Sequence, residues 1–279
     1  VIKFFFFLET VRISASQFGV RLYITAFPSG EPLPNLDERP IVRLRFVQDK
    51  SIARDPLFAA IPHRHTNRQL FDHDKAVDPA LMRSLVTPDD GFATDEAGIA
   101  PYRAIIVAAI TREMTVQRTY MESVQLTRIG AREIDALPDG IALSGPMMEA
   151  LSMTGQLDRA ALADTDSLAF KKGLDLQITS YGSIPALFWI KTKGNSRLHQ
   201  IDAGRRYVRA QLQAQTHGLA VHPMSQSLQE YPEMAELFTA IHRQTGAMPE
   251  ERIQMLARVG YASPILPAPR WPLEKMLAS

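Results

Sequence analysis

The period of the hydrophobic and polar positions changes along the chain, and these changes predict where helices and strands lie. Residues 4–18 carry apolar side chains at helical spacing, and Gly19 ends the run. We expect a helix that buries one face, formed by Phe4, Phe7, Leu8, Val11, Ala15 and Phe18. Residues 20–27 and 41–47 alternate apolar and polar side chains, and turn residues at 28–34 separate them. They predict two antiparallel strands on the edge of a larger sheet, since such a pair alone is too small to be stable.

The rest of the chain gives a second set of elements. Helices are predicted at 56–61, 78–85, 101–121, 198–217 and 232–243, and strands at 186–192, 219–222 and 254–260. Between them, residues 130–183 have many Gly and Pro breaks with little period, which is typical of a lid-like excursion. Residues 264–272 form an extended, Pro-rich tail. The order of strands and helices predicts an α+β fold, with helices on the faces of a mixed or antiparallel sheet.

Composition removes several classes of protein. The 279 residues are 46% hydrophobic, which is enough for one large or two modest domains. Lys and Arg number 31 against 30 Asp and Glu, so bulk positive charge for nucleic-acid binding is absent. The chain has no cysteine, which excludes disulfides, thiolate nucleophiles and cysteine-bound metal centres. No apolar run approaches the roughly 20 residues of a membrane span, and no secretory signal is evident.

The segment from Arg64 to Arg68 carries the clearest candidate chemistry. Two guanidiniums and the Thr66 hydroxyl lie within five residues, before what we expect to be a helix. Arginine binds phosphate through paired N–H groups, and Thr66 is positioned to cap the helix beside the same oxygens. The alternative is a solvated cluster of loop charges, and these residues alone do not decide between the two.

A second candidate lies where the strand at 219–222 ends. Ligands favour such strand exits because backbone N–H groups are unpaired there, so Ser225 and Gln226 are candidates for a main-chain cofactor contact. Three arginines of the preceding helix, at 205, 206 and 209, lie among small residues. Close helix packing explains that pattern first.

Other site types are not supported. His63, His65 and His73 suggest metal binding, but a site needs three or four ligands, and Asp72 and Asp74 lie on a segment that we expect to be exposed. We therefore predict no metal site. The nucleophile elbow, the phosphate-loop signature and the dinucleotide-binding fingerprint are also missing from the sequence, so no catalytic side chain is predicted.

Taken in order, these motifs resemble the flavin-dependent nitroreductase family. The likeness is carried by residues 61–71, 195–230 and 259–273, which contain Arg-His-Thr-Asn-Arg-x-x-Phe, Gly-Leu-Ala before a Pro-containing strand exit, Gly-Tyr and Pro-Ala-Pro-Arg. The chain is most similar to the fused branch of the family, in which one polypeptide holds two nitroreductase-like halves, often behind a twin-arginine signal. Residues 51–279 resemble the second half, with the excursion at about 130–183, and residues 1–50 resemble the tail of the first.

The resemblance implies an FMN site and an oxidoreductase that uses NAD(P)H as reductant. Hydride would pass through the flavin to a small-molecule acceptor of the nitro or quinone type, with no side chain as nucleophile. Arg64, Thr66 and Arg68 match the cluster of the family that binds the phosphate and ribityl groups, and Arg270 matches its C-terminal phosphate-binding arginine. Ser225 and Gln226 lie near the place where a backbone N–H meets flavin N5.

The sequence departs from the family pattern at one point. In the family the other half supplies a Gln-Pro-Trp segment to the flavin, but neither Trp189 nor Trp271 follows Gln-Pro. We therefore expect an N-terminally truncated chain whose cofactor site is partly built, with nitroreductase-like halves pairing within the chain or in a homodimer. As it stands the chain would be cytoplasmic, or periplasmic if an upstream segment carries a twin-arginine signal. The alternatives are a non-catalytic flavin-binding or flavin-sequestering protein, suggested by the excursion, and an incomplete fragment without independent activity.

Overall fold

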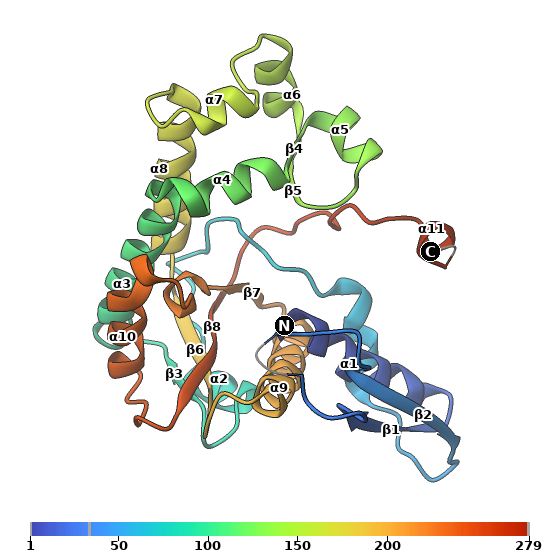
Figure 1. Ribbon diagram of the computed structural model, residues 1–279. Coiled ribbons are helices and arrows are strands. Elements are labelled where there is room, and N and C mark those ends of the chain that lie inside the picture. Colours follow the sequence, from blue (N-terminus) through green and yellow to red (C-terminus); the bar gives the residue numbers. More distant parts are fainter. Residues whose placement is uncertain (1, 33–34, 278–279) are drawn as a thin grey trace.

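A four-stranded antiparallel sheet lies at the centre of the molecule (Figure 1). The computed structural model describes residues 2–32 and 35–277, and for residues 2–5 the backbone alone. The strands follow the order β3 (Gly91–Ala93), β6 (Ala186–Thr192), β8 (Arg252–Gly260) and β7 (Ala220–Pro223), and each neighbouring pair is antiparallel. Helices flank this sheet, so the predicted α+β class is confirmed. The strands predicted at 186–192, 219–222 and 254–260 are confirmed to within two residues.

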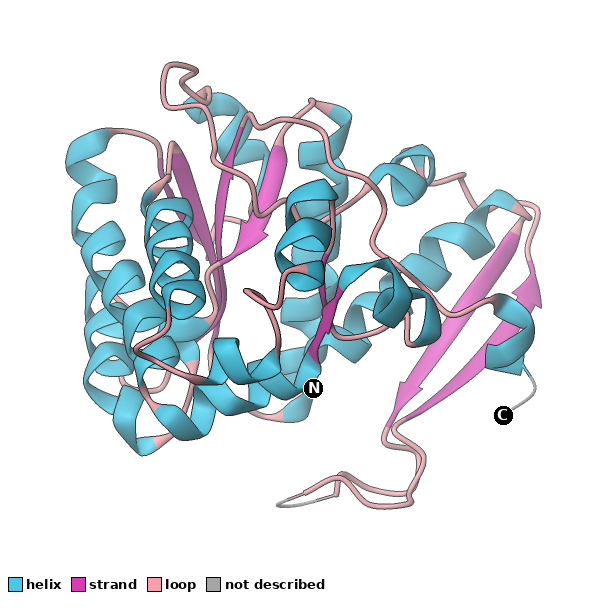
Figure 2. Ribbon diagram, turned by 90° about the horizontal axis from the view of Figure 1, so that it is seen from above, coloured by secondary structure: helices cyan, strands magenta, loops and turns pink. Residues whose placement is uncertain are grey.

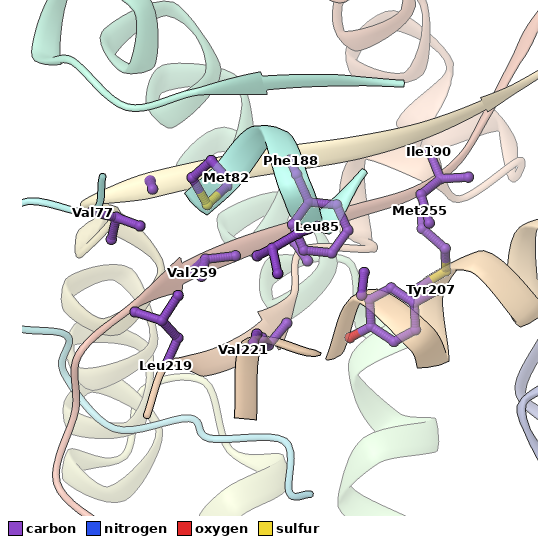
Figure 3. Close-up of a cluster of buried hydrophobic side chains, with 14 of the residues drawn as sticks. Val77, Met82, Leu85, Phe188, Ile190, Tyr207, Leu219, Val221, Met255 and Val259 are labelled. Atoms are coloured by element: carbon purple, nitrogen blue, oxygen red, sulfur yellow. The ribbon is translucent and has the colours of Figure 1, made fainter. Parts of the chain in front are cut away.

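Two helical layers cover the two faces of the sheet. Helices α2 (Pro79–Leu85) and α9 (Arg197–Thr216) lie on one face, and α3 (Glu96–Thr115), α8 (Leu168–Gly182) and α10 (Ala235–Gln244) lie on the other. The alternation of side chains along β6 explains this, because Phe188 packs with Tyr207 of α9 while Leu187 packs with Ile106 of α3. Figure 3 shows the hydrophobic cluster on the face covered by α2 and α9, in which Tyr207 lies beside Met255.

Helix α9 has the boundaries that its sequence predicts. The Ser196 hydroxyl accepts from the backbone N–H of His199 at its start, and Gly218 with φ +70° ends it. Its arginines are structural, as the packing interpretation held: Arg206 donates to Asp90 at 2.6 Å, and Asp90 is buried. Arg205 and Arg209 both turn toward helix α1 (Ile2–Gln17).

A buried carboxylate fixes the orientation of α1. Glu9 is 0% exposed and accepts hydrogen bonds from Arg12, Arg205 and Arg209. Burial by itself raises the pKa of Glu9, but the hydrogen bonds from Arg12 and Arg209 outweigh it and hold the pKa below its ordinary value. This network turns Leu8, Glu9 and Ile13 inward.

The predicted buried face of α1 is therefore wrong in part. Phe7 and Phe18 are exposed, although apolar spacing placed both on the buried side. The ion pairs between Glu9 and the arginines of α9 decide which side of α1 faces inward. The spacing of apolar residues in the sequence does not show these ion pairs. The side chain of Phe4 lies outside the described residues.

The first two strands form a sheet of their own. Strands β1 (Val20–Ala26) and β2 (Val42–Gln48) pair antiparallel, with Val20 opposite Gln48, and are set apart from the central sheet (Figure 2). The prediction of an edge position on a larger sheet is wrong. The pair is stabilised instead by packing of Ile24 and Leu44 against Leu8 of α1 and Ile201 of α9. Of the predicted turn at 28–34, residues 33 and 34 lie outside the described part.

The helix predicted at 101–121 is two helices. Helix α3 begins at Glu96, capped by Asp95, and α4 (Gln117–Leu126) starts after a break at Val116, whose backbone is extended. The Thr119 hydroxyl donates to the Glu113 carbonyl at 2.9 Å, which replaces a helical hydrogen bond at the break.

Residues 130–183 contain more regular structure than their weak period predicts. After β4 (Thr127–Ile129), the segment forms α5 (Gly130–Ala136), then β5 (Ile141–Leu143), which pairs parallel with β4, and then α6 (Pro146–Met153), α7 (Arg159–Ala163) and α8. Helix α8 packs against α3 and buries Phe170 and Tyr181. The buried side of α8 is therefore defined by its contact with α3 more than by the apolar spacing of its own sequence.

The remaining elements are short. They are the 3₁₀ helices η1 (Pro56–His63), η2 (Gln226–Leu228) and η3 (Pro232–Met234), and the terminal helix α11 (Leu273–Leu277). Within the described residues, no helix combines the length and apolar character that crossing a membrane requires.

Arg258 of β8 is a fully buried cation that joins three segments. Its guanidinium donates to the carbonyls of Ser180 and Ser183 at the end of α8 and to the carbonyl of Gln69, and it lies 4.1 Å from the centre of the Phe71 ring. Burial lowers the pKa of Arg258 to about 10, so the group stays charged at neutral pH. The segment around residues 69–71 is thereby attached to the central strand.

Replacing Arg258 by Met is expected to lower the free energy of unfolding by about 3–5 kcal/mol, because three carbonyls lose their common donor. Urea unfolding measures this. The control is Arg243→Met on the exposed side of α10, for which we expect a change within about 0.5 kcal/mol. Equal effects of the two substitutions would contradict the role of Arg258.

Candidate functional site

The segment Arg64–Arg68 lies against the outer strand of the central sheet. Arg64 follows η1 in an extended conformation, Thr66 forms a parallel bridge with Val221 of β7, and the Asn67 N–H donates to the Val221 carbonyl at 3.1 Å. The next helix along the chain is α2, at Pro79. Thr66 therefore caps no helix, and that prediction is wrong. The backbone of residues 66–69 forms hydrogen bonds with the edge strand β7 and with the Arg258 side chain, in place of the hydrogen bonds that a helix would form within the segment.

The C-terminal segment returns to the same place. The Asp72 N–H donates to the Tyr261 carbonyl at 2.8 Å, and the buried Asn67 side chain donates to the Ser263 carbonyl at 2.8 Å. Phe71 and Ala262 form an antiparallel bridge. These contacts direct the extended tail toward Arg64, so two segments about 200 residues apart in sequence share one surface.

The exposed Arg270 lies near enough to Arg64 for the two positive charges to interact, and we call these two residues the cationic pair. Burial lowers the pKa of the half-buried Arg64, and the positive charge of Arg270 lowers it further. Arg64 donates to Gln211 of α9 at 3.1 Å, and no carboxylate in the described part of the chain pairs with either guanidinium. The same two charges contribute to the lowered pKa of His65, whose largest cause is burial. Two neighbouring positive charges without a carboxylate partner favour the binding of an anion.

Tyr207 adds an unpaired hydroxyl beside Arg64. Its side chain is buried, burial raises its pKa, and its Oη has no hydrogen-bond partner among the described residues. Tyr207 and Gln211 lie four residues apart on one face of α9, and both were missed from the sequence. The sequence signal that could have identified Tyr207 and Gln211 is a pair of polar side chains four residues apart on a helix face made mostly of small residues.

Arg68 lies in a different environment from Arg64. It lines a cavity of about 360 Å³ together with Gln226, Tyr181 and Glu113. Its charge contributes to the lowered pKa of the buried His222, whose ring packs edge-on against Tyr181; burial is the largest cause of that shift and Arg258 the second. The six predicted residues thus fall into two groups, one around Arg64 and Arg270 and one around Arg68 and Gln226.

Thr66, Ser225 and Gln226 connect the two groups. Thr66 lies between the two arginines, next to β7, and β7 ends at Pro223. Ser225 then follows as an exposed residue whose carbonyl accepts from the N–H of Leu228, and Gln226 begins η2. The strand exit is therefore where the sequence predicts it.

Metal ligands do not gather in the described residues, where no group of three or more His, Asp or Glu side chains is placed to hold an ion. The histidines at 63, 65 and 73 belong to the surroundings of the cationic pair or to the loop after Phe71.

His222 predicts a pH dependence of stability. It is neutral at pH 7 in the folded and the unfolded chain, but below about pH 6.5 only the unfolded chain takes up the proton. The free energy of unfolding should therefore fall as the pH drops below about 6.5, by up to about 1.4 kcal/mol per pH unit from this residue. Urea unfolding over a pH series measures the slope.

The variant His222→Gln should flatten that slope, and His217→Gln, at an exposed position, should leave it unchanged. In His222→Gln part of the slope remains, because burial also lowers the pKa of His65 and His242. An equally steep slope in His222→Gln would contradict the assignment.

Comparison with known proteins finds likeness at the level of structure alone. No family model matches the chain, and no curated protein matches it. A single-residue variant of the FMN and NADPH-dependent nitroreductase NfnB from Sphigopyxis sp. strain HMH is similar, with 17% identity, a TM-score of 0.46, and coverage of 79% of this chain and 97% of that one. NfnB from Mycobacterium smegmatis, solved in complex with NADPH, shares 17% identity with a TM-score of 0.44 over 77% of this chain and 94% of its own.

An oxidised iodotyrosine deiodinase bound to FMN and 3-iodo-L-tyrosine is similar as well. It shares 15% identity with a TM-score of 0.40, over 77% of this chain and 94% of its own. At these identities and TM-scores, none of the three proteins assigns an activity to this chain.

Proposed function

We propose that this chain is an FMN-binding oxidoreductase that transfers hydride from NAD(P)H to a nitro-type or quinone-type acceptor. The observation that carries the proposal is the cationic pair of Arg64 and Arg270, which has no carboxylate partner among the described residues and lies close to the segment that pairs with β7. Two positive charges without a carboxylate partner among the described residues favour an anion, and a phosphate dianion supplies the opposite charge.

The residues present fit a ligand with a phosphate at one end and a planar ring at the other. Arg64 and Arg270 bind the phosphate in this proposal, and the unpaired hydroxyl of Tyr207 offers a further donor. Thr66 lies along the chain toward Arg68, where Ser225 and Gln226 take the ring end. The four backbone steps from Arg64 to Arg68 span at most roughly 13–14 Å, and we propose that one elongated ligand contacts both groups.

When FMN is bound, it supplies the hydride-transfer chemistry, and the side chains supply position and electrostatics. Arg64 and Arg270 fix the anionic end, and the sheet edge at Val221 fixes the backbone of residues 66 and 67. No side chain is assigned as a nucleophile.

The phosphate assignment is tested by comparing FMN with riboflavin, which lacks the phosphate. The Arg64→Ala variant should weaken FMN binding by about 1–3 kcal/mol, because a charge-assisted contact is lost, and should leave riboflavin binding unchanged. Quenching of flavin fluorescence measures both affinities. The exposed Arg43→Ala variant on β2 is the control and should bind FMN as the parent chain does.

Arg68→Ala should weaken FMN and riboflavin binding alike, because Arg68 lies on the side of Gln226. Unchanged FMN affinity in Arg64→Ala would falsify the phosphate assignment, and absence of flavin binding by the parent chain would remove the whole proposal.

Turnover is tested separately by following the flavin absorbance. Addition of NADH or NADPH to the FMN-loaded chain without oxygen should bleach the oxidised flavin band, and a nitroaromatic compound or a quinone should restore it. A chain that binds FMN but is bleached by neither nicotinamide would be a non-catalytic flavin-binding protein.

A further inference from the structure

The cavity beside Arg68 is enclosed mostly by apolar side chains from the helical region. It lies between α3, α4, α8 and η2 and measures about 360 Å³, which is within the range of small-molecule sites. Its apolar wall is formed by Ile110 and Met114 of α3, Val124 of α4, Leu143 of β5 and Leu162. Such a wall accommodates a hydrocarbon or aromatic body of modest size.

Two buried acceptors in this wall have no donor. Oε2 of Glu113 and Oε1 of Gln226 are both buried and have no hydrogen-bond partner among the described residues. Buried polar atoms are nearly always paired, and leaving them unpaired is costly. Both residues line the cavity, so a ligand with N–H groups satisfies them where the protein does not.

We propose that this cavity binds a small apolar molecule that carries one protonated amine. An ammonium has three donors and no acceptor, which suits two unpaired oxygens, and its charge compensates the Glu113 carboxylate. The Arg68 guanidinium lines the same cavity and disfavours a second ammonium, so the ligand is a monoamine. Arg68 and Gln226 also belong to the proposed flavin site, but amine binding is tested on the chain without flavin, so this inference stands or fails apart from the proposed function.

The groups that face Glu113 determine its pH behaviour. Burial raises the pKa of Glu113, the neighbouring Gln226 side chain reduces this rise, and the charge of Glu122 on α4 adds to it. From the other elements Tyr181 and Tyr231 face it, and burial raises the pKa of both, of Tyr181 to about 12, so neither carries charge at neutral pH.

Ammonium binding requires the carboxylate form of Glu113. The affinity for an amine should therefore rise as the pH rises through the Glu113 pKa, until the amine itself loses its proton. An uncharged ligand that accepts a hydrogen bond from the protonated acid would show the opposite trend.

The experiment is calorimetric titration of the full chain, without flavin, with 2-phenylethylamine and with the uncharged 2-phenylethanol. The amine should bind at least about tenfold more tightly than the alcohol, a factor that corresponds to about 1.4 kcal/mol. Glu113→Gln keeps the shape but removes the charge, and it should weaken amine binding at least tenfold. Glu122→Gln removes an exposed carboxylate outside the cavity and should change it less than twofold.

A second variant separates binding from folding. Gly173 of α8 lines the cavity, and a side chain added there meets open space. Gly173→Leu should fill the cavity and abolish amine binding while the helix forms at least as well as before. Failure of the parent chain to bind the amine, equal affinity for amine and alcohol, or full binding by Glu113→Gln or Gly173→Leu would each overturn the proposal.

Discussion

The structure depends most on one buried cation, Arg258. It sits on a central strand, and three backbone carbonyls from two distant segments, together with the Phe71 ring, surround it. Within the described part of the chain no carboxylate pairs with it, so the guanidinium acts as a set of fixed donors. It holds the end of α8 and the segment at residues 69–71 against the same point of the sheet. The basic segment upstream is held in addition by its pairing with Val221 and Ser263, and the end of α8 forms part of the wall of the cavity.

Pairing, more than residue type, separates structural arginines from functional candidates. Arg205, Arg206 and Arg209 all have carboxylate partners, and they orient α1 and the turn around Asp90. Arg64 and Arg270 lie near each other, and within the described residues neither meets a carboxylate. The same contrast holds for acids. Glu9 is surrounded by three guanidiniums, whereas Glu113 keeps a buried oxygen that has no hydrogen-bond partner in the described part of the chain. Both candidate sites are places where the protein leaves a charge or a polar atom uncompensated.

Local signals were enough for much of the fold. Helix α9 carries a serine cap and a terminal glycine, and β6, β7 and β8 are short apolar runs with clear ends. Local sequence signals gave wrong predictions where a helix depends on contacts with a neighbouring element. Helix α8 has little period of its own and relies on α3, and a hydroxyl of Thr119 ends α3 by taking over a helical hydrogen bond.

The sequence by itself determined the α+β class, the main strands and helix α9, which follow from periodicity and caps, and the candidacy of Arg64 and Arg68, which follows from their spacing. Arg270 became a candidate through the family resemblance alone. Only the tertiary structure decided that Glu9 is buried while Phe7 is exposed, that Arg64 and Arg68 belong to different surroundings, and that Tyr207 and Glu113 hold unpaired atoms. Burial and charge pairing join residues that are up to about 200 positions apart. No local pattern carries that information, because each residue's partner lies on another element.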